Sequence, residues 1–495
     1  MFFTSTRSRI EVSAAFAIAK GLAADGGLFV PSEFPRLDGE KISALCKMDY
    51  RQRAAAVLQG FLNDFSAAEV ARCVDGAYCG TFENDDPAPL KEVAPGMNVL
   101  ELWHGPTCAF KDMALQLLPY LLTTAAAKMD TGKETVILVA TSGDTGKAAL
   151  EGFADVPGTK IIVFYPRDGV SDMQKLQMTT QQGGNVAVCG IAGNFDDAQT
   201  GVKNIFADPE MAAALQKLNM EFSSANSINF GRLVPQIVYY VSAYCDLLNR
   251  GAIANGEAVN VCVPTGNFGN ILAAYYAKLM GLPVKRFICA SNTNNVLTDF
   301  ITTGTYDRNR KFYTTSSPSM DILISSNLER LLYHLYDNDP AAVSALMTAL
   351  KQEGKYTISP EALKKLQAEF YGGFTDENAT AATIRETFAV NNYLCDTHTA
   401  VAVNVYHQYR RETGDDTPCI VASTASPYKF APAVLAALTG DAVPADGFEQ
   451  MRQLAQTSAT AIPAPLAALA GKKVLHTSTV DKSDMRKFIL EFLQK

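Results

Sequence analysis

The sequence predicts an α/β protein, in which parallel sheets are covered by helices and a mainly helical region comes first. Short apolar runs such as ETVILVA (134–140) and AVNVCVP (258–264) end in loops rich in glycine, serine and threonine, and helical patterns follow these loops. Such continuous apolar runs, alternating with helices, are typical of a parallel sheet that is buried on both faces. By contrast, residues 1 to about 95 are rich in helix formers, as in VSAAFAIAKGLA and YRQRAAAVLQGFL, which favours helices there.

The alternation of strand and helix extends over most of the remaining chain. We expect it at residues 134–154, 159–178, 185–206, 258–281, 283–293 and 418–440. The stretch from about 305 to 390 is more polar and mainly helical, and we interpret it as an insertion. The predicted domains are a mainly helical N-terminal domain (1–95), a first α/β lobe (96–235) and a second α/β lobe (236–495) that contains the insertion.

The composition is that of an ordinary soluble globular protein and argues against several classes of function. The 495 residues carry a net charge of −8 without a run of lysine or arginine, which argues against nucleic-acid binding. No apolar run is long enough to span a bilayer, and Arg7, Arg9 and Glu11 interrupt the apolar patch at the N-terminus, so we expect neither a membrane segment nor a signal peptide. The ten cysteines form no C-x-x-C pair and the five histidines no metal-binding motif. We therefore expect a cytoplasmic protein without a metal.

One lysine stands in an unusual place. The segment ELWHGPTCAFKDMALQLLP (101–119) puts Lys111 at the start of an apolar helix, which Pro119 should kink or end early. The helix dipole and the apolar neighbours both disfavour a charged amine at this position and lower its pKa. A neutral amine attacks carbonyl carbons to form imines, so Lys111 is a candidate nucleophile. The alternative is that Lys111 extends its amine to water.

A glycine-rich loop is a candidate phosphate site. Gly-Asn-Phe occurs twice, but the first copy is followed by Asp196 and Asp197, which would repel a phosphate. The second copy, PTGNFGN (264–270), is neutral and joins a strand to a helix, and Gly266 and Gly269 allow close approach of a ligand to the backbone. The alternative is a turn that only connects the two elements.

A second strand-to-helix loop is TSGDTG (141–146). Asp144 is well placed to cap the helix that follows. Alternatively, Ser142, Thr145 and the loop amides hold a carboxylate or a phenolic oxygen.

Five motifs occur in one order along the chain: HGPTCAFKD, ATSGDTGKAA, SSANSINFGRL, VPTGNFGN and STASPYKF. Together they resemble the threonine synthase family, pyridoxal-phosphate (PLP) enzymes of fold type II, and most closely its bacterial and fungal branch with a long N-terminal region. GLAADGGLFVP, YPRDGVSDMQKLQM, SPSMDILISSNLERLL and DTHTAVA extend the resemblance over nearly the whole chain. The resemblance implies two parallel-sheet α/β lobes of the tryptophan-synthase-β-like PLP fold after the helical N-terminal domain.

The resemblance also implies roles for individual residues. It makes Lys111 the lysine that carries PLP as a covalent aldimine, and places the hydroxyl of Thr424 at the pyridine nitrogen. Ser426 stands where the family often has a histidine. The loop that wraps the cofactor phosphate would consist of Gly266, Asn267, Phe268, Gly269 and Asn270. The substrate pocket would include Ser142, Gly143, Asp144 and Thr145, together with Asn226, Ser227, Asn229 and Arg232.

Among these, Arg232 is our candidate for the substrate phosphate. A guanidinium can bind phosphate through two parallel hydrogen bonds. The alternatives are that Arg232 forms a surface or interdomain salt bridge, and that Lys147 contacts the phosphate instead.

The implied activity converts O-phospho-L-homoserine and water to L-threonine and phosphate by β,γ-elimination and replacement, the last step of threonine biosynthesis. Lys111 is then the best candidate to move protons at Cα and Cβ. The alternatives are a threonine-synthase-like phospho-lyase that releases a keto acid, another fold type II ammonia-lyase, and a non-catalytic α/β binding protein. We expect a small-molecule substrate and a monomer or homodimer.

Overall fold

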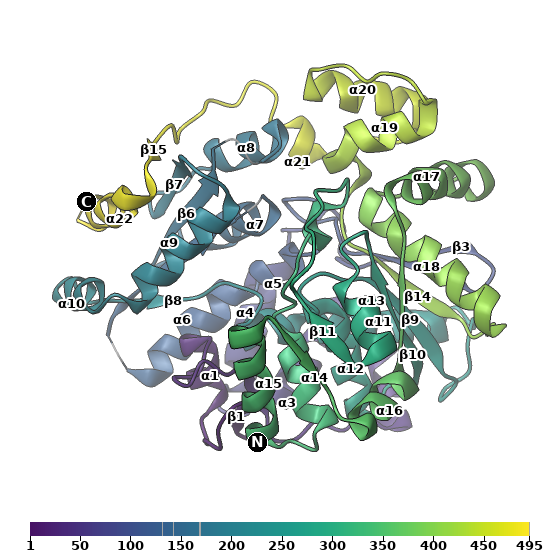
Figure 1. Cartoon of the computed structure of the whole chain (residues 1–495), viewed down its shortest axis with the longest axis horizontal. Coiled ribbons are helices and arrows are strands. Elements are labelled where there is room, and N and C mark those ends of the chain that lie inside the picture. The colour runs from purple at the N-terminus through teal and green to yellow at the C-terminus, as the bar shows by residue number, and fades with distance from the viewer. Residues whose placement is uncertain (131, 142, 168–169, 495) are drawn as a thin grey trace.

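The computed structural model describes residues 1–130, 132–141, 143–167 and 170–494. Two mainly parallel sheets form its centre (Figure 1). The smaller sheet has five parallel strands in the order β15-β7-β6-β5-β8. Their bounds are Glu134–Ala140 (β5), Thr159–Pro166 (β6), Val186–Ile191 (β7), Met220–Ser223 (β8) and Thr479–Val480 (β15).

The larger sheet has six strands in the order β13-β10-β9-β14-β4-β3, and only the edge strand β3 is antiparallel to its neighbour. The central strands of both sheets are buried, which explains why they read as continuous apolar runs. The predicted α/β class is therefore confirmed. The bounds are Leu90–Ala94 (β3), Met97–Glu101 (β4), Val259–Pro264 (β9), Val284–Ser291 (β10), Phe370–Phe374 (β13) and Cys419–Ser423 (β14).

Membership of the two sheets does not follow the order of the chain. Strand β4 pairs with β14, with Val99 opposite Val421, so residues just after 96 join the sheet of the second lobe. Strand β15, near the C-terminus, pairs with β7 of the first lobe. Strand β13 lies within the stretch interpreted as an insertion, yet it pairs with β10. The division at residues 95 and 235 therefore remains a proposal about how the chain is organised.

The N-terminal region is mainly helical, as its composition predicts. Its helices are α1 (Ala14–Lys20), α2 (Gly39–Leu45), α3 (Tyr50–Phe61) and α4 (Ala67–Tyr78), with a short antiparallel pair, β1 (Phe3–Ser5) and β2 (Phe29–Pro31). Each of these helices starts at a Ser or Asp whose side chain accepts a hydrogen bond from the first turn. Helix α1 packs on α6 (Leu118–Met129), and α3 packs on α11 (Phe230–Asn249). The region thus shares the main core rather than standing apart from it.

Helices cover both sheets. Against the five-stranded sheet lie α7 (Asp144–Phe153), α9 (Phe195–Ala207), α10 (Pro209–Lys217) and the C-terminal α22 (Met485–Leu493), and α8 (Asp172–Thr179) packs on α7. Against the six-stranded sheet lie α12 (Gly269–Met280), α13 (Val296–Thr303) and α18 (Thr397–Thr413). In Figure 1, α19 (Ala431–Thr439), α20 (Gly447–Ser458) and α21 (Ala464–Ala467) form a yellow-green layer at the top, from which the chain returns to β15.

Short elements elsewhere in the chain are helix α5 (Asp112–Leu115) and the 3-10 turns η2 (Pro427–Phe430) and η3 (Lys482–Asp484).

The stretch from 305 to 390 contains a small antiparallel pair of strands, several helices and the 3-10 turn η1 (Pro318–Met320). The elements of the stretch, besides β13 and η1, are β11 (Thr305–Asp307), β12 (Lys355–Thr357), α14 (Leu328–Leu335), α15 (Pro340–Glu353), α16 (Pro360–Glu369) and α17 (Glu377–Asn391).

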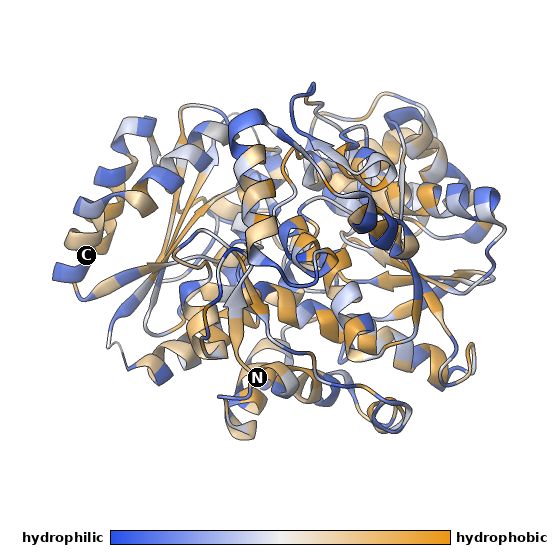
Figure 2. Cartoon of the chain, turned by 60° about the horizontal axis from the view of Figure 1, so that its bottom comes forward, coloured by the Kyte–Doolittle hydropathy of each residue, from blue (hydrophilic) through white to orange (hydrophobic). Residues whose placement is uncertain are grey.

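Hydrophobic residues gather in the interior strands and central helices, whereas the outer helices carry hydrophilic faces (Figure 2). Within the described ranges, no helix has both the length and the apolar character needed to cross a membrane.

The same residues contain no group of three or more histidine, cysteine or acidic side chains suited to a metal ion. The cysteines are free thiols, and Cys189, Cys262 and Cys289 are buried core residues as expected.

Candidate active site

The loops at the carboxyl ends of three parallel strands meet around Lys111. These loops follow β5, β9 and β14, which is where α/β proteins bind their ligands. The β14 loop lies beside the approach to Lys111, since the Phe110 amide donates to the Thr424 carbonyl at 2.8 Å. The β5 loop is tied to the β14 loop by an ion pair between Asp144 and Lys429.

The Lys111 amine is enclosed by protein groups. Its Nζ lies 3.4 Å from Ser319 Oγ and 3.7 Å from Asp144 Oδ2, and its side chain is only 12% exposed. Burial lowers the pKa of Lys111, Asp144 opposes this shift, and the positive charges of Lys429 and Arg232 add to it. The amine therefore does not extend into water, and the geometry favours the neutral nucleophile over the solvated lysine.

The helix that starts at Lys111 ends early, as Pro119 predicts. Helix α5 stops at Leu115, and α6 begins at Leu118 with Pro119 in its first turn. The neighbouring carboxylate of Asp112 turns away from the amine and accepts hydrogen bonds from the amide and hydroxyl of Thr107, at 2.8 and 2.7 Å. Burial raises the pKa of Asp112 to about 6. Asp112 thus holds the turn before Lys111 in place.

The second Gly-Asn-Phe loop has the features of an anion cradle. A Cβ atom on Gly266 would stand 2.6 Å from the Ser319 carbonyl oxygen, so only glycine fits there. Phe268 adopts a left-handed conformation with φ 63°, and no side chain caps the start of α12, which leaves its first amides available. The Asn270 side chain accepts a hydrogen bond from Tyr240, while its buried Nδ2 has no partner among the described residues. This donor set fits the phosphate of PLP.

Gly266→Ala should weaken binding of PLP without unfolding the protein. The added methyl group must displace the Ser319 backbone, and overpacking of this kind costs about 1–3 kcal/mol. We therefore expect about five- to 150-fold weaker affinity, measured by fluorescence titration of the cofactor-free protein. Gly39→Ala is a control for the same substitution at a site with space, because the nearest atom to the added Cβ of residue 39 is 3.5 Å away. Equal affinity in the Gly266 variant and the wild type would contradict the assignment.

The β5 loop differs from the expectation of a helix cap. The N-cap of α7 is Gly143, with φ 144°, and no side chain caps it in the manner predicted for Asp144. Instead, the Thr141 hydroxyl accepts hydrogen bonds from the amides of Gly143 and Gly146, at 3.0 and 2.9 Å. The capping prediction for Asp144 is wrong because its carboxylate is drawn to Lys429 Nζ, 2.7 Å away. Ser142 lies outside the described residues; Thr145 is half-buried.

In SANSINFGRL, Arg232 stands out because its guanidinium is buried and forms no ion pair with a carboxylate among the described residues. Nη1 donates to the Ala225 carbonyl at 2.6 Å, whereas the buried Nε has no partner among the described residues. Burial lowers the pKa of Arg232 to about 10, so it remains a cation at neutral pH. Arg330 is equally buried, but its Nε, Nη1 and Nη2 donate to Phe29, Asn327 and Ile228. Arg232 therefore has the open donors that an anionic ligand needs.

The other residues of this motif have different surroundings. Asn229 is the N-cap of α11: its Oδ1 accepts from the Gly231 amide and its Nδ2 donates to two carbonyls. Both Oδ1 and Nδ2 of Asn229 are engaged in these contacts within the protein. No contact supports a substrate role for Asn229, which remains a prediction. Asn226 and Ser227 are half-buried, and the Ser227 hydroxyl lies 3.5 Å from that of Ser326.

Lys147, the alternative phosphate ligand, is already paired. It donates to Glu151 at 2.7 Å and to the Gln181 side chain. Its charge is thus balanced within the protein, which favours Arg232 as the free cation.

Thr424 and Ser426 lie in a short segment that pairs with the residues before Lys111. Ala109 and Ala425 form a β-bridge, and the Ser426 amide donates to the Cys108 carbonyl at 3.1 Å. The Thr424 hydroxyl has no hydrogen bond among the described residues and is available to a ligand. Ser426, where the family often has histidine, starts η2 and accepts a hydrogen bond from the Tyr428 amide at 3.3 Å.

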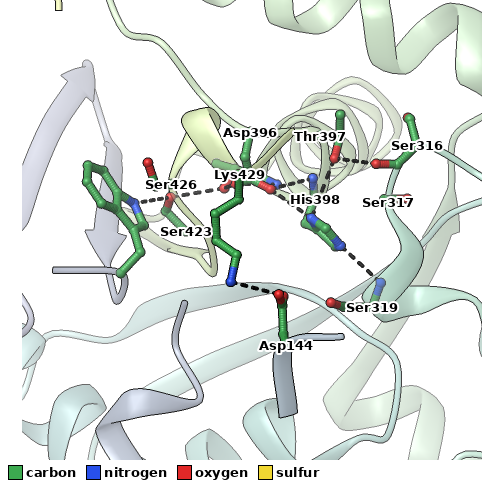
Figure 3. Close-up of polar contacts among 12 residues, drawn as sticks. Asp144, Ser316, Ser317, Ser319, Asp396, Thr397, His398, Ser423, Ser426 and Lys429 are labelled. Carbon is green, nitrogen blue, oxygen red and sulfur yellow. Dashed lines mark hydrogen bonds and ion pairs between the residues drawn. The ribbon is translucent and has the colours of Figure 1, made fainter. Parts of the chain in front are cut away.

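Two residues of this site, Ser319 and Lys429, were not predicted. They lie in SPSMDILISSNLERLL and STASPYKF, which contribute to the family resemblance, but a serine and a lysine in such segments do not by themselves indicate a site. Figure 3 shows how Ser319 is held: its amide donates to His398 Nε2 at 3.2 Å, and His398 Nδ1 bonds to Asp396 Oδ1 at 2.8 Å. Because Nε2 accepts, Nδ1 carries the proton, so Asp396 fixes the orientation of His398 and thereby that of Ser319.

A buried lysine beside a glycine-rich loop suited to a phosphate, at the strand ends of two mainly parallel sheets, is the arrangement expected of a pyridoxal-phosphate-dependent enzyme. The family model described as "Pyridoxal-phosphate dependent enzyme" matches residues 99–424. Models for the threonine synthase N terminus and for the C-terminal part of threonine synthase match residues 2–78 and 399–484. The chain belongs to the threonine synthase family.

Similar proteins extend over most of the chain. Human threonine synthase-like 1 is 44% identical over 441 residues, which cover 86% of this chain and 58% of that protein. This chain therefore spans about three fifths of the length of the threonine synthase-like relatives it matches. Threonine synthase from Pseudomonas aeruginosa is 40% identical over 423 residues, covering 85% of this chain and 87% of that protein. The crystal structure of PLP-bound threonine synthase from Brucella melitensis has a TM-score of 0.88 and 40% identity, covering 100% of this chain and 99% of that one.

Proposed function

We propose that this chain is a threonine synthase, which converts O-phospho-L-homoserine and water to L-threonine and phosphate. The observation that carries the proposal is the open guanidinium of Arg232 together with the buried amine of Lys111. A buried cation with free donors suits a phosphorylated substrate, and a lysine with a lowered pKa suits attachment of PLP. Membership of the threonine synthase family supports the same reaction.

The residues have distinct tasks in this reaction. PLP, when bound, supplies an electron sink for the negative charge that develops on the substrate. Lys111 holds the cofactor covalently, and its amine, once free, takes the proton from Cα and moves protons at Cβ. The loop Gly266–Asn270 holds the cofactor phosphate through backbone amides and the Asn270 side chain. Thr424 offers a neutral hydroxyl to the ring nitrogen.

The substrate would be held at both of its ends. Arg232 binds the phosphate that leaves, and the β5 loop around Ser142, Gly143 and Thr145 receives the amino-acid end. Asp144 of the same loop pairs with Lys429 through Oδ1, and its contact with the substrate remains a prediction. A cytoplasmic location and a monomeric or dimeric state remain predictions from the sequence.

The test supplies the purified, PLP-loaded protein with O-phospho-L-homoserine and measures threonine and phosphate together. We expect one threonine for each phosphate released. Loss of phosphate without threonine would contradict a threonine synthase.

A second candidate function is that of a threonine-synthase-like phospho-lyase; the chain is 44% identical to a threonine synthase-like protein as well as 40% identical to a threonine synthase. Both reactions lose the phosphate from the same carbon. A phospho-lyase then releases the carbon skeleton as 2-oxobutyrate with one ammonia, and consumes one water for each phosphate. Measuring 2-oxobutyrate and ammonia in the same reaction therefore distinguishes the two functions.

A further inference from the structure

Two buried lysines share one buried carboxylate beside the proposed attachment point of the cofactor. Lys429 Nζ lies 2.7 Å from Asp144 Oδ1, and Lys111 Nζ lies 3.7 Å from Asp144 Oδ2. The side chains of Lys429 and Asp144 are only 2% and 4% exposed. The carboxylate thus lies closer to Lys429 than to Lys111. Figure 3 shows the contact between Lys429 and Asp144.

Lys429 is itself held firmly. Its amine also donates to the Thr107 carbonyl at 2.9 Å, in the turn that precedes Lys111. Asp144 accepts a further hydrogen bond from the Gln174 amide at 3.2 Å. Lys429 follows β14 of one sheet and Asp144 follows β5 of the other, so their ion pair also joins the two sheets at the site.

We propose that Lys429 is a positioning residue, which draws Asp144 away from Lys111 and leaves the Lys111 amine free to act as a nucleophile and base. This inference rests on the proposed function, since it concerns the lysine assigned to the cofactor. Without Lys429, Lys111 would be the cation that remains paired with Asp144 among the described residues. The carboxylate would then stabilise a protonated Lys111 and slow its attack on a carbonyl.

The charged groups around Lys111 together set the pKa of its amine. Asp144 faces it from α7, Lys429 from η2 and Arg232 from α11, while Ser319 from η1 is neutral. Asp112, on the same helix as Lys111, is occupied by Thr107. Removing Lys429 deletes a positive charge and frees a negative one, and both changes raise the pKa of Lys111. Burial would raise the pKa of Asp144, but Lys429 and Lys111 hold it well below its usual value, so Asp144 stays ionised.

The test measures the Lys111 amine in the full-length, cofactor-free protein. Brief acetylation at a series of pH values, with mass spectrometry of each lysine peptide, reports the pH midpoint of the free amine. The exposed Lys473 serves as internal reference. We expect Lys429→Met to raise the midpoint at Lys111 by about one pH unit or more, and Lys429→Arg to keep it near the wild-type value.

A double variant separates this positioning from a general loss of structure. Adding Asp144→Asn to Lys429→Met removes the freed carboxylate, so the midpoint should return to the wild-type value or below. Lys147→Met is the matched control, because Lys147 is also a buried, paired lysine but bonds to Glu151 and Gln181. We expect no shift at Lys111 in that variant.

Two results would overturn the inference: an unchanged midpoint in folded Lys429→Met protein, or an equally raised midpoint in the double variant. If the Lys429→Met protein does not fold, the Asp144→Asn variant is compared with the wild type instead. In Asp144→Asn the pH midpoint at Lys111 should fall, and a rise would count against the inference. None of these measurements uses the substrate, so a failure of the threonine assay alone would contradict the proposed function and not this inference.

Discussion

Lys111→Ala should lose all covalent attachment of PLP and at least about a thousandfold of its activity, because one amine serves as attachment point and base. In the wild type, borohydride should fix the cofactor to the peptide that contains residue 111, and mass spectrometry should locate it there. In the variant, no peptide should gain this mass. Burial and the neighbouring cations favour the neutral amine at Lys111, which is the form that reacts.

The strongest contrary result would be cofactor mass on the peptide that contains Lys429. Lys429 is the other buried lysine at the site, but its amine is occupied by Asp144 and Thr107. Lys128→Ala is a suitable control for Lys111→Ala. Lys128 lies on the neighbouring helix α6 and pairs with Glu69 at 2.8 Å, so its loss should leave cofactor attachment unchanged.

The sequence predicted local structure well because local structure depends on local patterns. The continuous apolar runs at 134–140 and 259–264 are buried parallel strands, and Pro119 ends the short helix after Lys111. Local patterns could not predict which strand joins which sheet. Strand β4 could pair with any parallel neighbour as far as its own residues indicate, and its position beside β14 depends on contacts between distant parts of the chain.

Some residues of the candidate site could be predicted from nearby residues and others could not. Lys111 was predicted because a charge at the start of an apolar helix is unusual, and the loop at Gly266 because its glycines lie between a strand and a helix. The partner of Asp144 could not be read locally, because Lys429 follows a strand of the other sheet. The structural role of Asn229 could have been predicted, because an asparagine directly before a long apolar helix is a favourable N-cap.

Arg232→Met should weaken the interaction with the substrate phosphate by about a hundred- to ten-thousandfold. Each charge-assisted hydrogen bond that the guanidinium makes to a buried phosphate is worth about 1.5–3 kcal/mol, and the variant loses at least two donors. The effect should be seen as a higher KM for O-phospho-L-homoserine and as weaker inhibition by inorganic phosphate. The absorbance of the bound cofactor should be unchanged, because we propose that the loop around Gly266, and not Arg232, holds the cofactor phosphate.

The stability of the same variant should change in the opposite direction to its affinity. Without a ligand, Arg232 is a buried cation whose Nε has no partner among the described residues, so replacing it with methionine removes an uncompensated charge. We expect the Tm of the cofactor-loaded variant to equal or exceed that of the wild type, and added phosphate to raise the Tm of the wild type only. Arg53→Lys is the control: Arg53 is buried and already paired with Asp246 at 2.7 Å, so its loss should lower Tm and leave phosphate inhibition unchanged. If Arg232→Met still responded to phosphate as the wild type does, Arg232 would be a structural residue and the substrate phosphate would have to bind elsewhere.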